Sequence, residues 1–459
     1  MDHAKQLTEL TISRLLFRFS FPAIIALLVS VFYNIVDRFF VGRAIGTMGI
    51  AATTVALPIM LILMAFIMLV GGGAATLITL KLGAKKKERA ELVLGNSFTL
   101  FIAFSLILSV LGLVFLDPLL KIFGASQDVL PYARIYTGII LTGNIFQTIG
   151  LGMNSFIQGE GKPKLAMAAM LIGCLVNILL CPLFINVFNL GIGGSALATV
   201  IAQMVSAAFV LYYYLSGRSI LKLYPRNLLL DRGIVFRIVA IGVAPFSMQI
   251  AASILNAILN NQLLTYGGDT AISVMGVIYS ILALLLMPIS GINQGMLPII
   301  GHNYGAGKFC RVQKTLKLAL VCATIIAIAG FILTRVYSIG LIHMFSKGNH
   351  YVVMMGRHAM LIFFLVFPVM GLQLITTNYF QAIGKAKHMM FLNLSRQLII
   401  LIPAIIILPR FWGLDGIWYV MPLADAASAL LTGIWLVMEM QRLNVKKSEQ
   451  ARNEAALES

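Results

Sequence analysis

The stretch FSFPAIIALLVSVFYNIVDRFFVG, residues 19–42, is apolar and long enough to cross a bilayer, which takes about 20 helical residues. It nevertheless carries a carboxylate, Asp37. A charged side chain in hydrocarbon costs about 3 kcal/mol on insertion scales, so such a group usually faces a polar cavity or binds a cation. Asp37 is therefore the first functional candidate, and helical geometry predicts that Tyr33 and Asn34 share its face. The alternative is a structural carboxylate, satisfied by hydroxyl groups at helix ends or by Arg38.

The composition of the whole chain indicates a membrane protein. Of the 459 residues, 60% are hydrophobic and 11% are charged, and the mean hydropathy is +0.95. A chain this apolar is not a water-soluble protein, so the sequence predicts an all-α polytopic membrane protein. The opening residues lack a small-residue cleavage site, and the first span is expected to act as its own insertion signal. Apolar runs predict twelve transmembrane helices, near residues 15–41, 49–80, 92–116, 132–157, 165–186, 193–215, 234–262, 270–302, 315–336, 352–381, 389–409 and 414–438.

Lysine and arginine residues are distributed unevenly between the expected loops. They gather at the N-terminus, in alternate loops and in the C-terminal tail, whereas the other loops hold only Arg43, Lys121, Lys347 and Arg410. Basic loops stay in the cytoplasm, so both termini of this multi-pass membrane protein are expected there.

Several other classes of protein are disfavoured. The net charge of +18 is spread over short loops and forms no single face for nucleic acid. The four cysteines lack C-x-x-C spacing, which argues against a disulfide framework or a metal site. The sequence contains no nucleophile motif, no nucleotide-binding loop and no cluster of His, Asp and Glu at useful spacing. An enzyme is therefore not predicted, and no cofactor is expected. No repeated filter-like segment predicts a channel.

The chain also repeats itself. Gln158, Gly161, Lys162 and Lys164 recur 223 residues later as Gln381, Gly384, Lys385 and Lys387, and Pro22 recurs as Pro245. The repeat predicts two homologous six-helix lobes, residues 1–215 and 234–438, joined by a cytoplasmic linker at 216–233 and followed by a charged tail at 439–459. Because six is even, both lobes enter the membrane from the same side. Transporters built this way commonly bind substrate between their halves.

The chain resembles the multidrug and toxic compound extrusion (MATE) antiporters, and most closely their DinF- and MepA-like bacterial branches. Three stretches carry the resemblance: Pro22 through Asp37 to Gly42, the loop Gln158-Gly-Glu-Gly-Lys-Pro-Lys164, and Gln294-Gly-Met-Leu-Pro-Ile-Ile-Gly-His-Asn-Tyr-Gly-Ala-Gly307. The resemblance implies two lobes in a V with a central cavity that opens alternately to each side.

The resemblance to DinF-like members also implies a cation site in the N-terminal lobe. Where those relatives have a second aspartate, this chain has Cys181, and a site with one carboxylate holds a bare Na⁺ less well. We therefore expect coupling to H⁺, with Na⁺ near Asp37, Asn177 and Thr199 as the alternative. The implied cation-coupling residues are Tyr33, Asp37, Tyr136, Asn154, Asn177 and Thr199. For Tyr136, Asn154, Asn177 and Thr199 the alternative is a hydrogen bond between helices.

Secondary candidates lie in the second half of the chain. NorM-like relatives have acids in the seventh and tenth helices, but the seventh span here offers neutral groups, among them Gln249, Asn256 and Asn260. Asp425 is either a second titrating site or the structural partner of Arg396 in the preceding span, and the pairing is the interpretation we favour. Asn34 and Cys181 are further candidates, and Phe146, Met153, Met275 and Met287 are candidate cavity-lining residues of a soft wall suited to promiscuous binding.

Together these features predict a multidrug efflux antiporter. It would export lipophilic, often cationic compounds by alternating access, as a monomer in contact with membrane lipid and without nucleic acid, and it would contribute to antibiotic resistance. One alternative is a Na⁺-coupled drug antiporter. Another is a lipid-linked oligosaccharide flippase of the same superfamily, which would be expected to place more cationic residues in its cavity.

Overall fold

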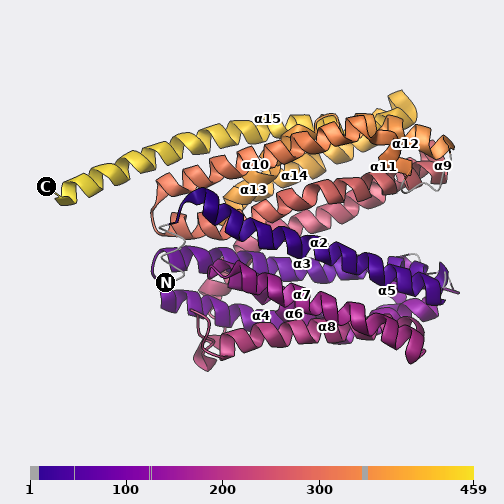
Figure 1. Cartoon of the computed structure of the whole chain (residues 1–459), viewed down its shortest axis with the longest axis horizontal. Coiled ribbons are helices and arrows are strands. Elements are labelled where there is room, and N and C mark those ends of the chain that lie inside the picture. Colours follow the sequence, from indigo (N-terminus) through magenta and orange to yellow (C-terminus); the bar gives the residue numbers. More distant parts are fainter. Residues whose placement is uncertain (1–9, 46, 124, 126, 344–349, 459) are drawn as a thin grey trace. The chain divides into compact units, whose positions relative to one another are not determined.

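The computed structural model describes residues 10–45, 47–123, 125, 127–343 and 350–458, and it is shown in Figure 1. Within these ranges the chain forms helices and turns and contains no strand, which confirms the predicted all-α class. The side chains of Tyr33, Asn34, Asp37 and Asn260 lie outside the described part.

The helices of the first half follow one another closely. α6 (Leu130–Gly159) packs against α3, α4, α7 and α8, so it is the central helix of this half (Figure 1). The other elements are α2 (Ile12–Ile45), α3 (Thr47–Gly83), α4 (Lys87–Val114), α5 (Leu116–Ile122), α7 (Pro163–Pro182), a short π-helix η1 (Leu183–Val187), and α8 (Gly191–Leu215).

The second half begins with α9 (Arg232–Gly305), which bends at Gly268, and ends with α15 (Ile402–Glu458), which bends at Gly413. α9 contains two of the predicted spans, near 234–262 and 270–302, whereas α15 contains the span near 414–438 and only the last residues of the one near 389–409. α15 also carries the C-terminus (Figure 1). Between them lie α10 (Phe309–Val336), α11 (Ser338–His343), α12 (His350–Phe363), α13 (Phe367–Ala382), α14 (Ala386–Leu394) and the π-helix η3 (Ser395–Leu401).

Nine helical stretches of the described chain are long and apolar enough to cross a membrane, and a pair bent by 53° at residues 364–366 makes ten. The last stretch, Ala386–Val445, is 60 residues long and contains the bend at Gly413, so it covers the last two predicted spans. α6 is not among these stretches, and it carries polar side chains that include Asn144, Gln147 and Asn154.

The internal repeat is visible in the backbone. α4 and α10 both have 28 residues, and each is followed by one non-helical residue and a short helix. The two break residues, Phe115 and Tyr337, have closely similar backbone angles, φ −101°, ψ 21° and φ −108°, ψ 21°. In this part of the repeat, equivalent residues are therefore 222 positions apart.

Two compact units divide the chain at different points from the predicted lobes. One contains residues 25–249, and the other contains residues 10–24 and 250–458. The first turns of α2 thus belong with the second unit, where Ser20 lies against Gly295 so closely that a Cβ on that glycine would be 2.4 Å from the Ser20 hydroxyl. Similarly, the start of α9 packs on α3 in the first unit, where Gly242 meets the Leu69 carbonyl. Glycine at these crossings lets two backbones touch.

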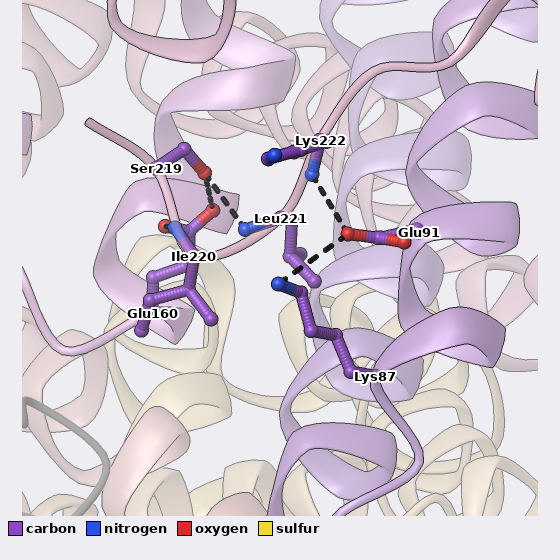
Figure 2. Close-up of polar contacts among 7 residues, drawn as sticks. All are labelled: Lys87, Glu91, Glu160, Ser219, Ile220, Leu221 and Lys222. Atoms are coloured by element: carbon purple, nitrogen blue, oxygen red, sulfur yellow. Dashed lines mark hydrogen bonds and ion pairs between the residues drawn. The ribbon is translucent and has the colours of Figure 1, made fainter. Parts of the chain in front are cut away.

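The segment that joins α8 to α9 is held on the first unit by buried polar groups (Figure 2). The Glu160 carboxylate accepts hydrogen bonds from the Tyr213 hydroxyl (2.6 Å), the Ser219 hydroxyl (2.7 Å) and the Ile220 amide (3.0 Å). Burial raises the pKa of the Glu160 carboxyl. Glu91 accepts from the Lys222 amide at 3.1 Å. The predicted linker is therefore an ordered strap.

Candidate functional site

A cavity of about 320 Å³ lies inside the first unit. Its wall is mostly apolar and is formed by α3, α6, α7 and α8. None of the lining residues in the described part of the chain carries a charge. They are Met60 and Met64 of α3, Tyr136, Ile140, Phe146, Gln147, Gly150 and Leu151 of α6, Met170, Gly173, Cys174 and Asn177 of α7, and Thr199, Ala202, Gln203 and Ser206 of α8.

Helical spacing explains why these residues converge. The lining residues of α7 and of α8 both follow the pattern i, i+3, i+4, i+7, which is one face of an α-helix. Small residues set the distances between the helices. A Cβ at Gly173 would be 3.4 Å from the Ala202 carbonyl oxygen, and a Cβ at Gly150 would be 3.4 Å from the Ala207 amide. α7 and α6 thus approach α8 at backbone distance on either side of the cavity.

Polar side chains of the cavity offer hydrogen-bond acceptors to a ligand. The side-chain nitrogen of Asn177, Nδ2, donates a hydrogen bond to the Thr199 hydroxyl at 3.1 Å. The Asn177 Oδ1 atom takes no part in this hydrogen bond. Among the described residues, Asn177 Oδ1 and Gln203 Oε1 are buried oxygen atoms that accept no hydrogen bond. A buried polar atom without a partner is costly, so such atoms are expected to meet a ligand or water. The arrangement can therefore accept hydrogen bonds from a ligand that carries N–H or O–H groups.

The structure brings together three of the residues predicted for the cation site, because Tyr136, Asn177 and Thr199 line this cavity. Asn154 is buried on α6 but is not among the lining residues, and its Oδ1 accepts no hydrogen bond within the described part of the chain. The predicted Tyr33, Asn34 and Asp37 lie on α2, with side chains outside the described residues.

Cys181 is fully buried one turn beyond Asn177. It packs in an apolar cluster with Val41, Ile185 and Ala198, and it does not line the cavity. The contact with Val41 brings α2 against α7 near this end of the cavity.

The candidates in the second half lie in different surroundings. Asn256 is exposed, Gln249 is half-buried, and Asn260 has a side chain outside the described part. Asp425 is buried, and its Oδ1 atom accepts from Arg396 Nε at 2.8 Å and lies 2.6 Å from Arg396 Nη2. The favoured pairing of Asp425 with Arg396 is thus present.

Sequence reasoning missed Gln147, Cys174, Gln203 and Ser206 as lining residues. The sequence does contain a signal for the last two, namely helical spacing. Gln203 and Ser206 follow Thr199 by four and seven residues, which places all three on one face of a helix. Of the four candidate lining residues, Phe146 lies in the wall of this cavity, whereas Met153, Met275 and Met287 do not.

Comparison with known proteins shows the family to which the chain belongs. The model of the MatE family matches residues 22–183 and 244–407, one block in each half. The chain belongs to the MatE family. Over 448 residues it is 26% identical to the multidrug export protein MepA of Staphylococcus haemolyticus (strain JCSC1435), covering 96% of both chains. It is 27% identical over 435 residues to MepA of Staphylococcus aureus (strain MRSA252), covering 94% of this chain and 95% of that one.

Solved structures of MATE proteins share the fold. The MATE multidrug transporter DinF-BH, solved as a complex, matches with a TM-score of 0.87 at 37% identity, over 93% of this MatE chain and 95% of that one. A MATE protein in a bent conformation matches with a TM-score of 0.91 at 24% identity, over 98% and 99% of the two chains, which shows the fold alone. The predicted fold class and the resemblance are confirmed, and the chain is a multi-pass membrane transporter.

Proposed function

We propose that this MatE protein is an efflux antiporter that exports lipophilic, often cationic compounds from bacteria by alternating access. The observation that carries the proposal is the cavity itself, whose described wall is uncharged and holds two buried acceptor oxygens, on Asn177 and Gln203. The methionine side chains of the wall adapt to ligands of different shape, which suits a broad range of substrates. The carbonyl oxygens accept hydrogen bonds from the ammonium or amide groups of such compounds.

The relatives support this reading, since MepA is a multidrug export protein and DinF-BH is a multidrug transporter. The flippase alternative is less well supported. Holding an anionic lipid-linked sugar calls for cationic side chains, and no Lys or Arg is among the described residues that line the cavity.

We further propose that protons drive the export through Asp37. Asp37 comes one helical turn before Val41 in α2, and Val41 packs against Cys181, which comes one turn after Asn177 in α7. On this reasoning Asp37 belongs at the level of Asn177 and the cavity. A single carboxylate carries a proton without a second ligand, whereas Na⁺ near Asp37, Asn177 and Thr199 remains the competing proposal. In this proposal the protein acts as a monomer in the inner membrane with both termini in the cytoplasm.

Transport in proteoliposomes tests both parts. We expect ethidium efflux under an imposed pH gradient, and none under a Na⁺ gradient at constant pH. Asp37→Asn should reduce efflux to the level of empty vesicles, because the amide keeps the size of the side chain but cannot carry a proton. Asp128→Asn is the matched control, since Asp128 is exposed, and it should transport normally. Normal efflux by Asp37→Asn would remove this residue from the mechanism, and efflux driven by Na⁺ alone would favour the competing ion.

A further inference from the structure

A second cavity in the first unit has an entirely different wall. It is a groove of about 310 Å³ between α3, α4 and α6, and its lining includes Ile62, Leu108, Leu111 and Leu141. Ile62 is 36% exposed and Leu111 is 50% exposed, so the groove opens on the outer surface of the unit. α3 and α4 are both long and apolar enough to span the membrane, and acyl chains therefore cover this surface.

The internal repeat explains why the groove is open. Gly112 in its floor is equivalent to Thr334 of α10, and Leu141 is equivalent to Phe364. Phe364 is buried and packs edge-on with Phe367, at 5.3 Å between ring centres. The second unit thus carries larger side chains at the two positions where the first unit leaves space.

Cationic groups lie at the end of the groove where α4 stops. The short helix α5 contributes Leu119 to the groove wall, and Lys121 follows two residues later with an exposed side chain. Arg134 stands on α6 two turns before Leu141 and donates from Nε to Asp117 Oδ1 at 2.7 Å. The Arg134 guanidinium holds the pKa of the Asp117 carboxyl below its usual value, so the carboxylate is ionised and the three groups carry a net charge of +1.

We propose that this groove binds one acyl chain of a membrane phospholipid whose phosphate is held by Lys121 and Arg134. The apolar wall matches the chain in chemistry, and the cations match the phosphate in charge. Arginine presents five N–H donors, so it can bind Asp117 and a phosphate oxygen at the same time.

Native mass spectrometry of the full-length protein tests the proposal. The purified protein is depleted of lipid in detergent, titrated with phosphatidylglycerol, and compared with the variants Leu141→Phe and Ile62→Phe, which fill the groove from different helices. We expect both variants to lose one bound phosphatidylglycerol that the wild type retains. Leu106→Phe is the matched control, because Leu106 is exposed on α4 but does not line the groove, and it should bind as the wild type does.

A separate measurement tests the proposed contact between Lys121 and the lipid phosphate. Lys121→Gln should weaken phosphatidylglycerol binding up to about fivefold, since an exposed ion pair contributes up to about 1 kcal/mol. It should leave the binding of diacylglycerol, which lacks a phosphate, unchanged. Ethidium efflux confirms that each variant is folded. Equal lipid retention by the wild type and both groove-filling variants would overturn the acyl-chain site, and an unchanged affinity in Lys121→Gln would overturn the phosphate contact.

Discussion

The hydrogen-bonding role of Gln203 in the cavity can be tested by a substitution that keeps the size of the side chain. Its Oε1 atom is buried without a hydrogen-bond donor among the described residues, and it lies on the same helix face as Thr199. A ligand that donates to this oxygen removes the cost of the unpaired atom, which makes Gln203 a specificity-determining residue in the proposed function.

Gln203→Met is therefore expected to weaken the binding of cationic drugs with N–H groups by about tenfold, which corresponds to a hydrogen bond to a charged group. The methionine keeps the length of the side chain and the shape of the wall. Ligand titration of the purified protein with ethidium, which has amino groups, measures the effect. A quaternary cation without N–H groups serves as the control and should bind equally well to both proteins. A loss of both ligands would indicate damage to the cavity instead.

Lys85 is a second informative residue, because its φ angle is +57°. Its repeat equivalent, 222 positions later, is Gly307, with φ +75°. Both residues end a helix with the same type of backbone hydrogen bond, from residue 85 to the carbonyl of residue 82 and from residue 307 to that of residue 304. A side chain in the left-handed region costs about 1–2 kcal/mol, whereas glycine adopts it freely.

We predict that Lys85→Gly raises the stability of the protein by about 1 kcal/mol. The thermal midpoint in detergent should rise accordingly. Asn189→Gly is the matched control, because Asn189 has φ +53° and asparagine tolerates this conformation better. Its gain should be smaller, and an unchanged midpoint in Lys85→Gly would contradict the assigned strain.

At the scale of elements, the strap between α8 and α9 shows how an irregular segment becomes fixed. Asn96 of α4 is fully buried and donates to the Asn227 and Leu229 carbonyls, both at 3.2 Å, while its Oδ1 accepts from the Asp231 amide at 2.7 Å. The neighbouring Gly95 lets the strap approach, since a Cβ there would lie 2.3 Å from the Asn227 carbonyl oxygen. The strap carries α9 to its starting point on the first unit.

Asn96→Ala should therefore release the strap, at a cost of about 1–3 kcal/mol for the backbone groups left unpaired. The measurement is limited trypsin digestion in detergent, and cleavage is expected after Arg218, Lys222 or Arg226 in the variant before it occurs in the wild type. Gln313→Ala is a suitable control, because Gln313 forms an exposed hydrogen bond with Asn444 and does not touch the strap. Equal cleavage rates in the wild type and Asn96→Ala would show that other contacts hold the segment.

In each of the two units, the first lysine of the same loop motif contacts the chain at an equivalent place, although by a different interaction. Lys162 donates to the Arg218 carbonyl just after α8, and Lys385 pairs with Glu439 at 2.7 Å near the end of the last apolar stretch. In each repeat, the lysine thus binds the chain where it leaves the sixth predicted span. This agreement supports an even number of spans per half, with both repeats oriented alike.

Thiol labelling of intact cells tests that topology. Cysteines placed at Lys86 and Lys222, in a chain without its four native cysteines, should react with membrane-impermeant reagents only from the cytoplasm. A cysteine at Asn189, in the loop after η1, should react only from outside. All three positions are exposed in the structure, so reactivity reports on the side of the membrane. Labelling of Lys222→Cys from outside would contradict two six-helix repeats in parallel.

The sequence by itself determined the class of the protein and its duplication, and of the residues that line the cavity it indicated Tyr136, Phe146, Asn177 and Thr199. Hydropathy and the 3.6-residue period are local properties, so the helical character of the spans followed from them. The pairing of Asp425 with Arg396 was also predictable, because an ionised group in a membrane span requires a partner.

Only the tertiary structure decided which faces meet. Asn177 binds Thr199 because Gly173 brings α7 to backbone distance of α8, and no local pattern specifies that approach. The same holds for the groove beside Leu141, and for the first turns of α2, which pack on Gly291 and Gly295 within the second unit. Contacts between residues far apart in the chain depend on the volumes of both partners, and a single sequence lists those volumes without saying which of them come together.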